Sequence, residues 1–258
     1  MISLIQKVKK HQFLFEELVK RDFKQKYKRT ILGMGWSVLS PLLTLLVMQL
    51  VFGHFFGSRI SHYTTYLFCG NLLFSYFKEA TTGSMNALVS NANIFTKINV
   101  PKYLFLLSKN VSSIINFGLT LIIFFVFVFA DSITLQWKFF MLLFPICCLT
   151  LFNIGVGLVL SALFVFYRDV NYLYNIFTML LMYMSAIFYQ ITIVPEKFRM
   201  MFYLNPLYCY IEYFRKIVIE AAIPSLEYHL LCLFYAVLFI GIGGWMYMKY
   251  NRKFLYYL

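Results

Sequence analysis

The chain has 258 residues, of which 61% are hydrophobic and only 13% charged, with a mean hydropathy of +0.74. Because about a quarter of the residues in soluble domains are charged, this composition excludes a water-soluble globular protein. The net charge of +13 does not indicate nucleic-acid binding, since nine Lys and Arg residues precede Ile31 and most others lie in short connections between apolar runs. Such a distribution is typical of a membrane protein whose orientation is set by its cations.

Residues 1–30 are predicted to form a cytoplasmic amphipathic helix at the membrane interface. Phe15, Val19, Phe23 and Tyr27 recur every fourth residue and form one apolar stripe. Acids precede bases by four residues on the other faces, which favours helical ion pairs such as one between Asp22 and its fourth neighbour. A helix of this kind lies flat on a membrane with its cations among anionic headgroups. The alternative is a solvated helix packed on a soluble core.

Six apolar windows follow, each long enough to cross a bilayer, for which roughly 20 residues are needed. They cover about residues 31–54, 63–89, 109–131, 139–167, 172–193 and 228–248. More cations fall inside than outside when both termini are placed in the cytoplasm. The sequence therefore predicts an all-α integral membrane protein, with a six-span domain at 31–248 and a cytoplasmic tail at 249–258.

Two features interrupt this pattern. Lys78 and Glu79 lie within the second span, where charges are costly, and at least one of them should face protein or water. Residues 194–224 contain two short, charged amphipathic pieces that cannot cross a membrane, so we expect external re-entrant helices. A plain surface loop is the alternative for that segment.

Motifs for enzymatic chemistry are lacking in the sequence. It has no GxxxxGK[ST] loop for ATP, and its four histidines, five cysteines and few acids show no metal-ligand spacing. We therefore expect no catalytic residue, no metal and no cofactor in this chain. Glycines at 155, 157, 241, 243 and 244 lie inside apolar spans, where they allow close helix packing.

Four segments together resemble the permease subunits of type-2 ABC exporters of the polysaccharide group, which move O-antigen, teichoic acid or capsule. They are RDFKQKYKRTILGMGWSVLSP at 21–41, SNANIFTKINVPKYLF at 90–105, FYRDV at 166–170 and AIFYQITIVPEKFRMMFYLNPLYCYIEYFR at 186–215. The resemblance implies a six-span homodimer in the bacterial cytoplasmic membrane that docks two copies of an ATPase subunit, which would bind the ATP and Mg²⁺. It also implies a lipid-linked glycan of the undecaprenyl-pyrophosphate type as substrate.

The resemblance further implies a coupling helix at about 91–101 that inserts into the ATPase. The expected contact residues are Asn93, Ile94, Phe95, Lys97, Ile98, Arg168 and Asp169. An apolar face on a cytoplasmic turn suits a hydrophobic groove, although a plain connecting turn is the alternative. A structural role at a helix end is equally open for Arg168 and Asp169.

Recognition of the lipid pyrophosphate favours cations near the first span, and we expect Lys26, Lys28 and Arg29 to provide them. Attraction of anionic membrane lipids is the alternative role. Sugars pass over flat apolar faces with polar rims, which makes these side chains candidates for the channel lining: Tyr63, Tyr66, Tyr76, Lys78, Glu79, Tyr183 and Tyr189. The tyrosines could equally be lipid-belt or core residues.

Other functions remain open from the sequence. They are an exporter of a small lipid or drug, a membrane glycosyltransferase or polymerase, and a passive channel.

Overall fold

The computed structural model of the chain describes residues 11–58, 60–95, 97, 100–251 and 253–257, and these residues form helices and connections without a strand. The helices are α2 (Gln12–Tyr27), α3 (Trp36–Phe56), α4 (Tyr63–Ser90), α5 (Ala92–Phe95), α6 (Tyr103–Ala130), α7 (Leu143–Phe166), α8 (Val170–Met184), α9 (Glu196–Tyr203), α10 (Pro206–Val218), α11 (Leu226–Tyr250) and α12 (Phe254–Tyr257). Three short 3₁₀ turns lie at Gly33–Gly35, Trp137–Leu142 and Ile191–Ile193. The prediction of an all-helical protein is confirmed for this part of the chain.

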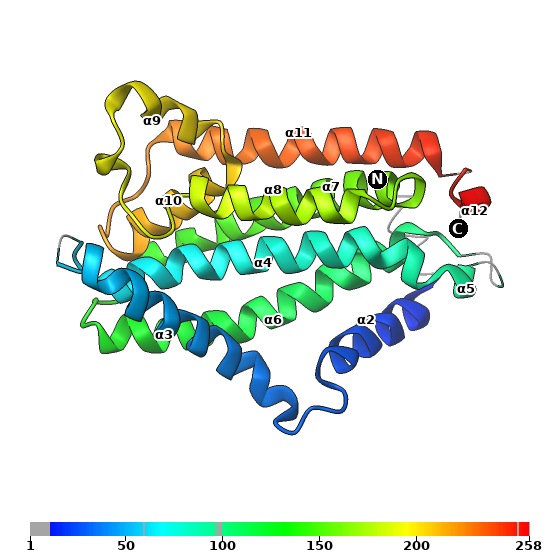
Figure 1. Ribbon diagram of the computed structural model, residues 1–258, viewed down its shortest axis with the longest axis horizontal. Coiled ribbons are helices and arrows are strands. Elements are labelled where there is room, and N and C mark those ends of the chain that lie inside the picture. The colour runs from blue at the N-terminus through cyan, green and yellow to red at the C-terminus, as the bar shows by residue number, and fades with distance from the viewer. Residues whose placement is uncertain (1–10, 59, 96, 98–99, 252, 258) are drawn as a thin grey trace.

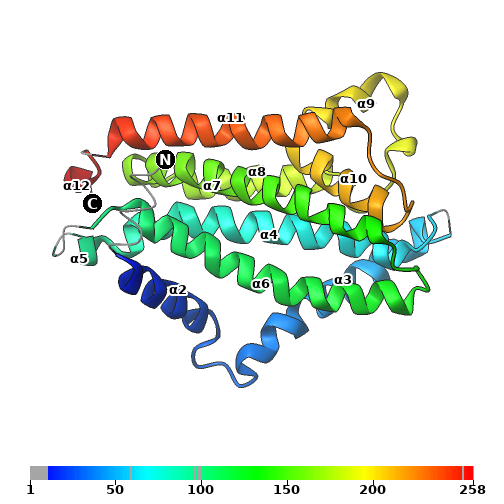
Figure 2. The ribbon, with the colours of Figure 1, turned by 180° about the vertical axis from the view of Figure 1, so that it is seen from behind.

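The long helices form an elongated bundle (Figures 1 and 2). Helices α4, α6, α7, α8 and α11 run lengthwise. Helices α2 and α3 lie along one edge of the bundle and are joined by a bend that projects away from it. The short helices α5 and α12 lie at one end of the bundle, and α9 and α10 lie at the other. The two ends therefore carry different sets of short helices.

Four helical segments within the described residues are long and apolar enough to cross a membrane: 33–56, Tyr103–Ala130, Trp137–Phe166 and Leu226–Tyr250. Helix α4 has 28 residues but carries polar side chains along its second half. Helix α8 has only 15 residues, which at about 1.5 Å per residue is shorter than the hydrocarbon core. The structure supports a multi-pass membrane protein, and the count of six spans stays a prediction.

Helices α7 and α11 approach closely because glycines meet at their contact. A Cβ atom added at Gly155 would overlap the backbone at Phe239, and one added at Gly243 would overlap the carbonyl oxygen of Gly155. Open space surrounds Gly241 and Gly244 on the same helix. Close packing thus depends on particular glycines, as small-residue interfaces between membrane helices do.

Helix α10 is a core helix although its segment is charged. Its side chains Tyr210, Tyr213 and Phe214 have no exposed surface. Asn205 caps the helix by accepting a hydrogen bond from the Leu207 amide at 3.0 Å, and its own amide donates to the end of α8. The segment is thereby fixed to the bundle, and its re-entry into a membrane stays a prediction.

Arg215, the last residue of the segment 186–215, is buried in α10 with 3% of its surface exposed. Its guanidinium donates to the carbonyl oxygens of Ala186 at 2.9 Å, Ile187 at 3.0 Å and Tyr66 at 3.2 Å. It also lies 3.5 Å from the centre of the Tyr66 ring. A fork of several donors suits this cluster of carbonyls, so Arg215 connects α10 to α4 and to the segment after α8.

Replacing Gly243 by Ala should destabilise the contact between α7 and α11. Overpacking of a tight contact costs about 1–3 kcal/mol, so the melting temperature in detergent should fall. The matched control is Gly241→Ala, which adds the same methyl group to the same helix where there is open space. Equal melting temperatures for the two variants would contradict this packing.

Candidate functional site

Helix α2 is fastened to α6 through a buried carboxylate. Asp22 has a side chain that is 1% exposed; it accepts a hydrogen bond from the Ser108 hydroxyl at 3.0 Å and pairs with Lys109 at 2.9 Å and Arg21 at 2.8 Å. The helical pattern predicts that Asp22 pairs with Lys26, four residues along α2. In the structure Asp22 pairs with Lys109 and Arg21 instead. The pattern fails because a buried carboxylate needs several donors, and α6 supplies them. The apolar stripe of α2 is half-buried, with Tyr27 buried at its end.

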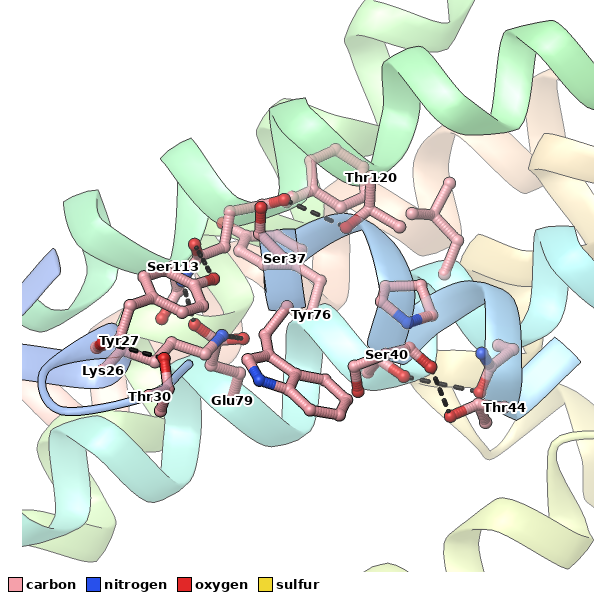
Figure 3. Close-up of a pocket in the computed structure, with 17 residues that line it drawn as sticks. Lys26, Tyr27, Thr30, Ser37, Ser40, Thr44, Tyr76, Glu79, Ser113 and Thr120 are labelled. Atoms are coloured by element: carbon pink, nitrogen blue, oxygen red, sulfur yellow. Dashed lines mark hydrogen bonds and ion pairs between the residues drawn. The ribbon is translucent and has the colours of Figure 1, made fainter. Parts of the chain in front are cut away.

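A second polar network joins the end of α2 to α4 and α6 (Figure 3). Lys26 Nζ lies 2.7 Å from one carboxylate oxygen of Glu79, and the Asn116 amide donates to the other at 2.6 Å. The Tyr27 hydroxyl donates to the Asn116 oxygen at 2.9 Å. Glu79 therefore contacts protein, as predicted for at least one charge in this span, while Lys78 is exposed. Both oxygens of the Glu79 carboxylate therefore have a hydrogen-bonding partner from another helix.

The residues of this network line a first cavity of about 310 Å³, which lies between the end of α2, the first half of α3, α4 and α6. Its lining combines aromatic rings with neutral polar side chains. The residues are Lys26, Tyr27, Thr30, Trp36, Ser37, Ser40, Pro41, Thr44, Asn71, Leu72, Ser75, Tyr76, Glu79, Ser113, Asn116, Phe117 and Thr120. Ser37, Ser40 and Thr44 share one face of α3 at spacings of three and four, a signal that was present in the sequence.

A second cavity of about 1010 Å³ adjoins the first and shares Lys26, Glu79 and Ser113 with it. Its charged lining consists of five cations and two carboxylates: Arg21, Lys24, Lys26, Lys28 and Lys109 against Asp22 and Glu79. Cations are thus in excess, and the two acids are already paired. The second cavity can hold an anion.

Both cavities border one polar face of α4. Between residues 75 and 86, each position of α4 that is not buried carries a polar side chain or glycine. We call these residues the polar track: Ser75, Lys78, Glu79, Thr82, Gly83 and Asn86. In a helix that spans a membrane, such a face is directed toward protein or a water-filled passage.

Comparison with known proteins identifies the family. Residues 14–219 match the model of the ABC-2 type transporter family. The chain belongs to this family. It is 28% identical over 247 residues to the O-antigen export system permease protein RfbA of Klebsiella pneumoniae, covering 94% of this chain and 95% of that protein. It is 27% identical over 232 residues to the protein of the same name from Myxococcus xanthus, covering 88% of this chain and 88% of that protein.

The cations expected at a substrate entrance of this ABC-2 transporter are divided by the structure. Lys26 and Lys28 line the second cavity, whereas Arg29 lies in the bend between α2 and α3, outside both linings. Arg21, Lys24 and Lys109 also line the second cavity, although they were not predicted to bind substrate. Lys24 belongs to the same basic run in the sequence. Lys109 could not be recognised, because it appears in the sequence only as the start of a span.

Among the residues expected to contact an ATPase, those that the structure describes lie at the end of the bundle that carries α5 and α12. Helix α5 is a four-residue turn, shorter than the expected segment at 91–101; Asn93 and Lys97 are exposed, and Ile94 packs against the core. Ile98 lies outside the described residues, as does the side chain of Phe95. The turn between α7 and α8 exposes Arg168 and Asp169 at this end, since Phe166 beside it contacts Phe254 of α12. Their coupling role stays a prediction.

The tyrosines expected in a channel have different surroundings. Tyr63 and Tyr66 are buried, and their hydroxyls donate to the carbonyl oxygens of Phe188 at 3.0 Å and Tyr189 at 2.7 Å. Tyr76 lines the first cavity and bonds to Thr150 at 2.9 Å. Tyr183 is half-exposed on α8, where its carbonyl oxygen accepts from the Tyr189 hydroxyl. Of these five tyrosines, Tyr76 alone lines the first or the second cavity, while Tyr66 lines a third cavity of about 200 Å³.

Metal binding finds no support in the described part of the chain, where no three His, Cys, Asp or Glu residues come together. The ABC-2 family assignment makes this chain a transporter component.

Replacing Asp22 by Asn should loosen α2 from α6. The substitution leaves Lys109 without its buried partner, and we expect a loss of about 1–3 kcal/mol in stability together with faster proteolysis between α2 and α3. Glu17→Gln is the control, because Glu17 makes an exposed pair with Lys20 within α2, and its hydrogen bond raises the pKa of Lys20. Equal proteolysis of both variants would show that Asp22 does not anchor the helix.

Proposed function

We propose that this chain is the membrane subunit of an ATP-driven exporter that moves a lipid-linked polysaccharide, of the O-antigen or teichoic-acid kind, across the bacterial cytoplasmic membrane. The observation that carries the proposal is the basic second cavity beside the neutral, aromatic first cavity along one transmembrane helix. The second cavity suits a diphosphate and the first cavity suits a polyol. Support comes also from the relatives, two of which are O-antigen export permeases.

The proposed architecture has six spans, formed by α3, α4, α6, α7, α8 and α11, with both termini and α5 in the cytoplasm and α9 and α10 outside. Helices α3 and α8 present large exposed apolar side chains, among them Leu46 and Leu50 on α3 and Ile176 and Leu180 on α8. In a membrane, lipid or a second copy covers such surfaces. We propose a homodimer in which these helices flank the passage.

Recognition of the substrate would begin at the second cavity. A lipid diphosphate carries its negative charge beside a membrane anchor, and Lys24, Lys26 and Lys28 lie where α2 meets the bundle. Charge-assisted hydrogen bonds to phosphate are shorter and stronger than neutral ones. The anion is therefore held at the membrane interface while the glycan extends along the polar track.

The energy would come from two copies of a separate ATPase subunit, which binds ATP and Mg²⁺. Its docking surface is proposed at the end of the bundle that carries α5 and the turn containing Arg168 and Asp169. An exporter of a small lipid or drug is the second candidate, because a basic cavity also accepts a phospholipid headgroup.

The double substitution Lys24→Gln and Lys28→Gln should weaken binding of a lipid diphosphate and slow export. Loss of two charged donors lowers affinity by about tenfold or more, because each charge-assisted hydrogen bond contributes about 1.5–3 kcal/mol. The measurement is binding of undecaprenyl diphosphate and glycan-stimulated ATP hydrolysis by the chain purified with its ATPase. Lys249→Gln with Lys253→Gln, two exposed cations outside both cavities, is the control. Stimulation of ATP hydrolysis by phospholipid alone would favour the second candidate.

A further inference from the structure

The first cavity differs chemically from the second, although the two share Lys26, Glu79 and Ser113. Its only charged residues are Lys26 and Glu79, which pair with each other at the shared boundary. The remaining lining is neutral. We propose that the first cavity is a subsite for one sugar, the monosaccharide joined directly to the diphosphate. This subsite rests on the function proposed above.

The walls of the cavity match the two kinds of surface on a sugar ring. Trp36 from α3, which is 38% exposed, supplies an aromatic ring against which the apolar C–H face of a pyranose can pack, and Tyr76 from α4 and Phe117 from α6 add largely buried rings to the lining. Tyr76 and Phe117 contact each other, with ring centres 4.7 Å apart, so this wall is pre-formed. A volume of about 310 Å³ is at the lower limit for small-molecule pockets and admits a ligand the size of one sugar.

The polar side chains are arranged to accept hydrogen bonds from hydroxyl groups. Thr44 and Ser113 donate their own hydrogens to the carbonyl oxygens of Ser40 and Lys109, at 2.9 and 3.0 Å. Their oxygen atoms keep lone pairs that can accept. The amide nitrogen of Asn71 has no hydrogen-bond partner among the described residues, although Asn71 is buried, with 6% of its surface exposed. It is available as a donor at the same cavity.

The shared boundary fixes which part of the substrate enters. A diphosphate bound to the cations of the second cavity places its next sugar at Lys26 and Glu79, which line both spaces. Glu79 already accepts from Lys26 and Asn116, and each oxygen has a further lone pair for a sugar hydroxyl. The pair thus connects recognition of the anion to recognition of the first sugar.

Fluorescence of Trp36 tests this subsite in the full chain. The substitutions Trp137→Phe and Trp245→Phe leave Trp36 as the one tryptophan of the three. The protein, in nanodiscs, is titrated with farnesyl diphosphate, with farnesyl diphosphate joined to N-acetylglucosamine, and with phosphatidylglycerol. We expect the sugar-bearing probe to bind at least about fivefold tighter than farnesyl diphosphate and to be alone in shifting Trp36 emission, because only it adds hydrogen bonds at this cavity.

Two substitutions on opposite walls separate the sugar from the diphosphate. Ser75→Leu on α4 and Ser40→Leu on α3 should each abolish the advantage of the sugar-bearing probe and leave farnesyl diphosphate binding unchanged. Thr64→Leu, on α4 but outside both cavities, should change neither. Using both walls guards against a variant that fails to fold.

The outcomes are distinct. Equal binding of the two diphosphates without a shift of Trp36 emission overturns the sugar subsite and leaves the proposed exporter function standing. An equal shift with phosphatidylglycerol shows that the cavity takes a lipid headgroup and also overturns it. Failure of both diphosphates to bind would remove the proposed function together with the subsite.

Discussion

The ion pair between Lys26 and Glu79 is the interaction on which the rest of the site depends. A carboxylate in the middle of a helix that spans a membrane is costly unless its charge is compensated. Lys26 and Asn116 bind its two oxygens, so α2, α4 and α6 meet at one point. Because the first cavity lies on one side of this point and the second on the other, the pair both stabilises the site and divides it.

The two ends of the bundle hold their buried charges in different ways. At the α2 end, Asp22 is surrounded by cations and a hydroxyl, which fastens an amphipathic helix to the bundle. At the α10 end, the guanidinium of Arg215 donates to three backbone carbonyl oxygens instead. Between them, aromatic packing and the glycine contact of α7 with α11 form an apolar framework. The polar track therefore lies on a framework that is fixed at both ends.

The sequence is informative where a single helix carries the signal. Hydropathy located the long helices, although α6 begins at Tyr103 and not near residue 109, and α8 ends at Met184 and not near residue 193. The charges at 78 and 79 indicated that one face of α4 meets protein or water. The partners themselves were out of reach, because Glu79 is 53 positions from Lys26 and Asp22 is 86 from Ser108. The burial of Arg215 could not be predicted either, because no local pattern shows that three carbonyl oxygens converge on it. The spacing of Ser37, Ser40 and Thr44 is visible in the sequence, but these residues were not predicted to form a polar face. The segment is apolar as a whole and was therefore interpreted only as a membrane span.

Water accessibility along α4 in native membranes tests the central claim most directly. In a chain without its five cysteines, single cysteines at Ser75, Gly83 and Asn86 sample the polar track, and cysteines at Ile122 and Val126 sample an exposed apolar face of α6. Thiols react as thiolates, which form in water and not in lipid, so a polar maleimide should label the three α4 positions at least about tenfold faster than the α6 positions. Equal labelling of both sets, or labelling of α6 alone, would contradict a water-exposed track beside the Lys26 and Glu79 pair.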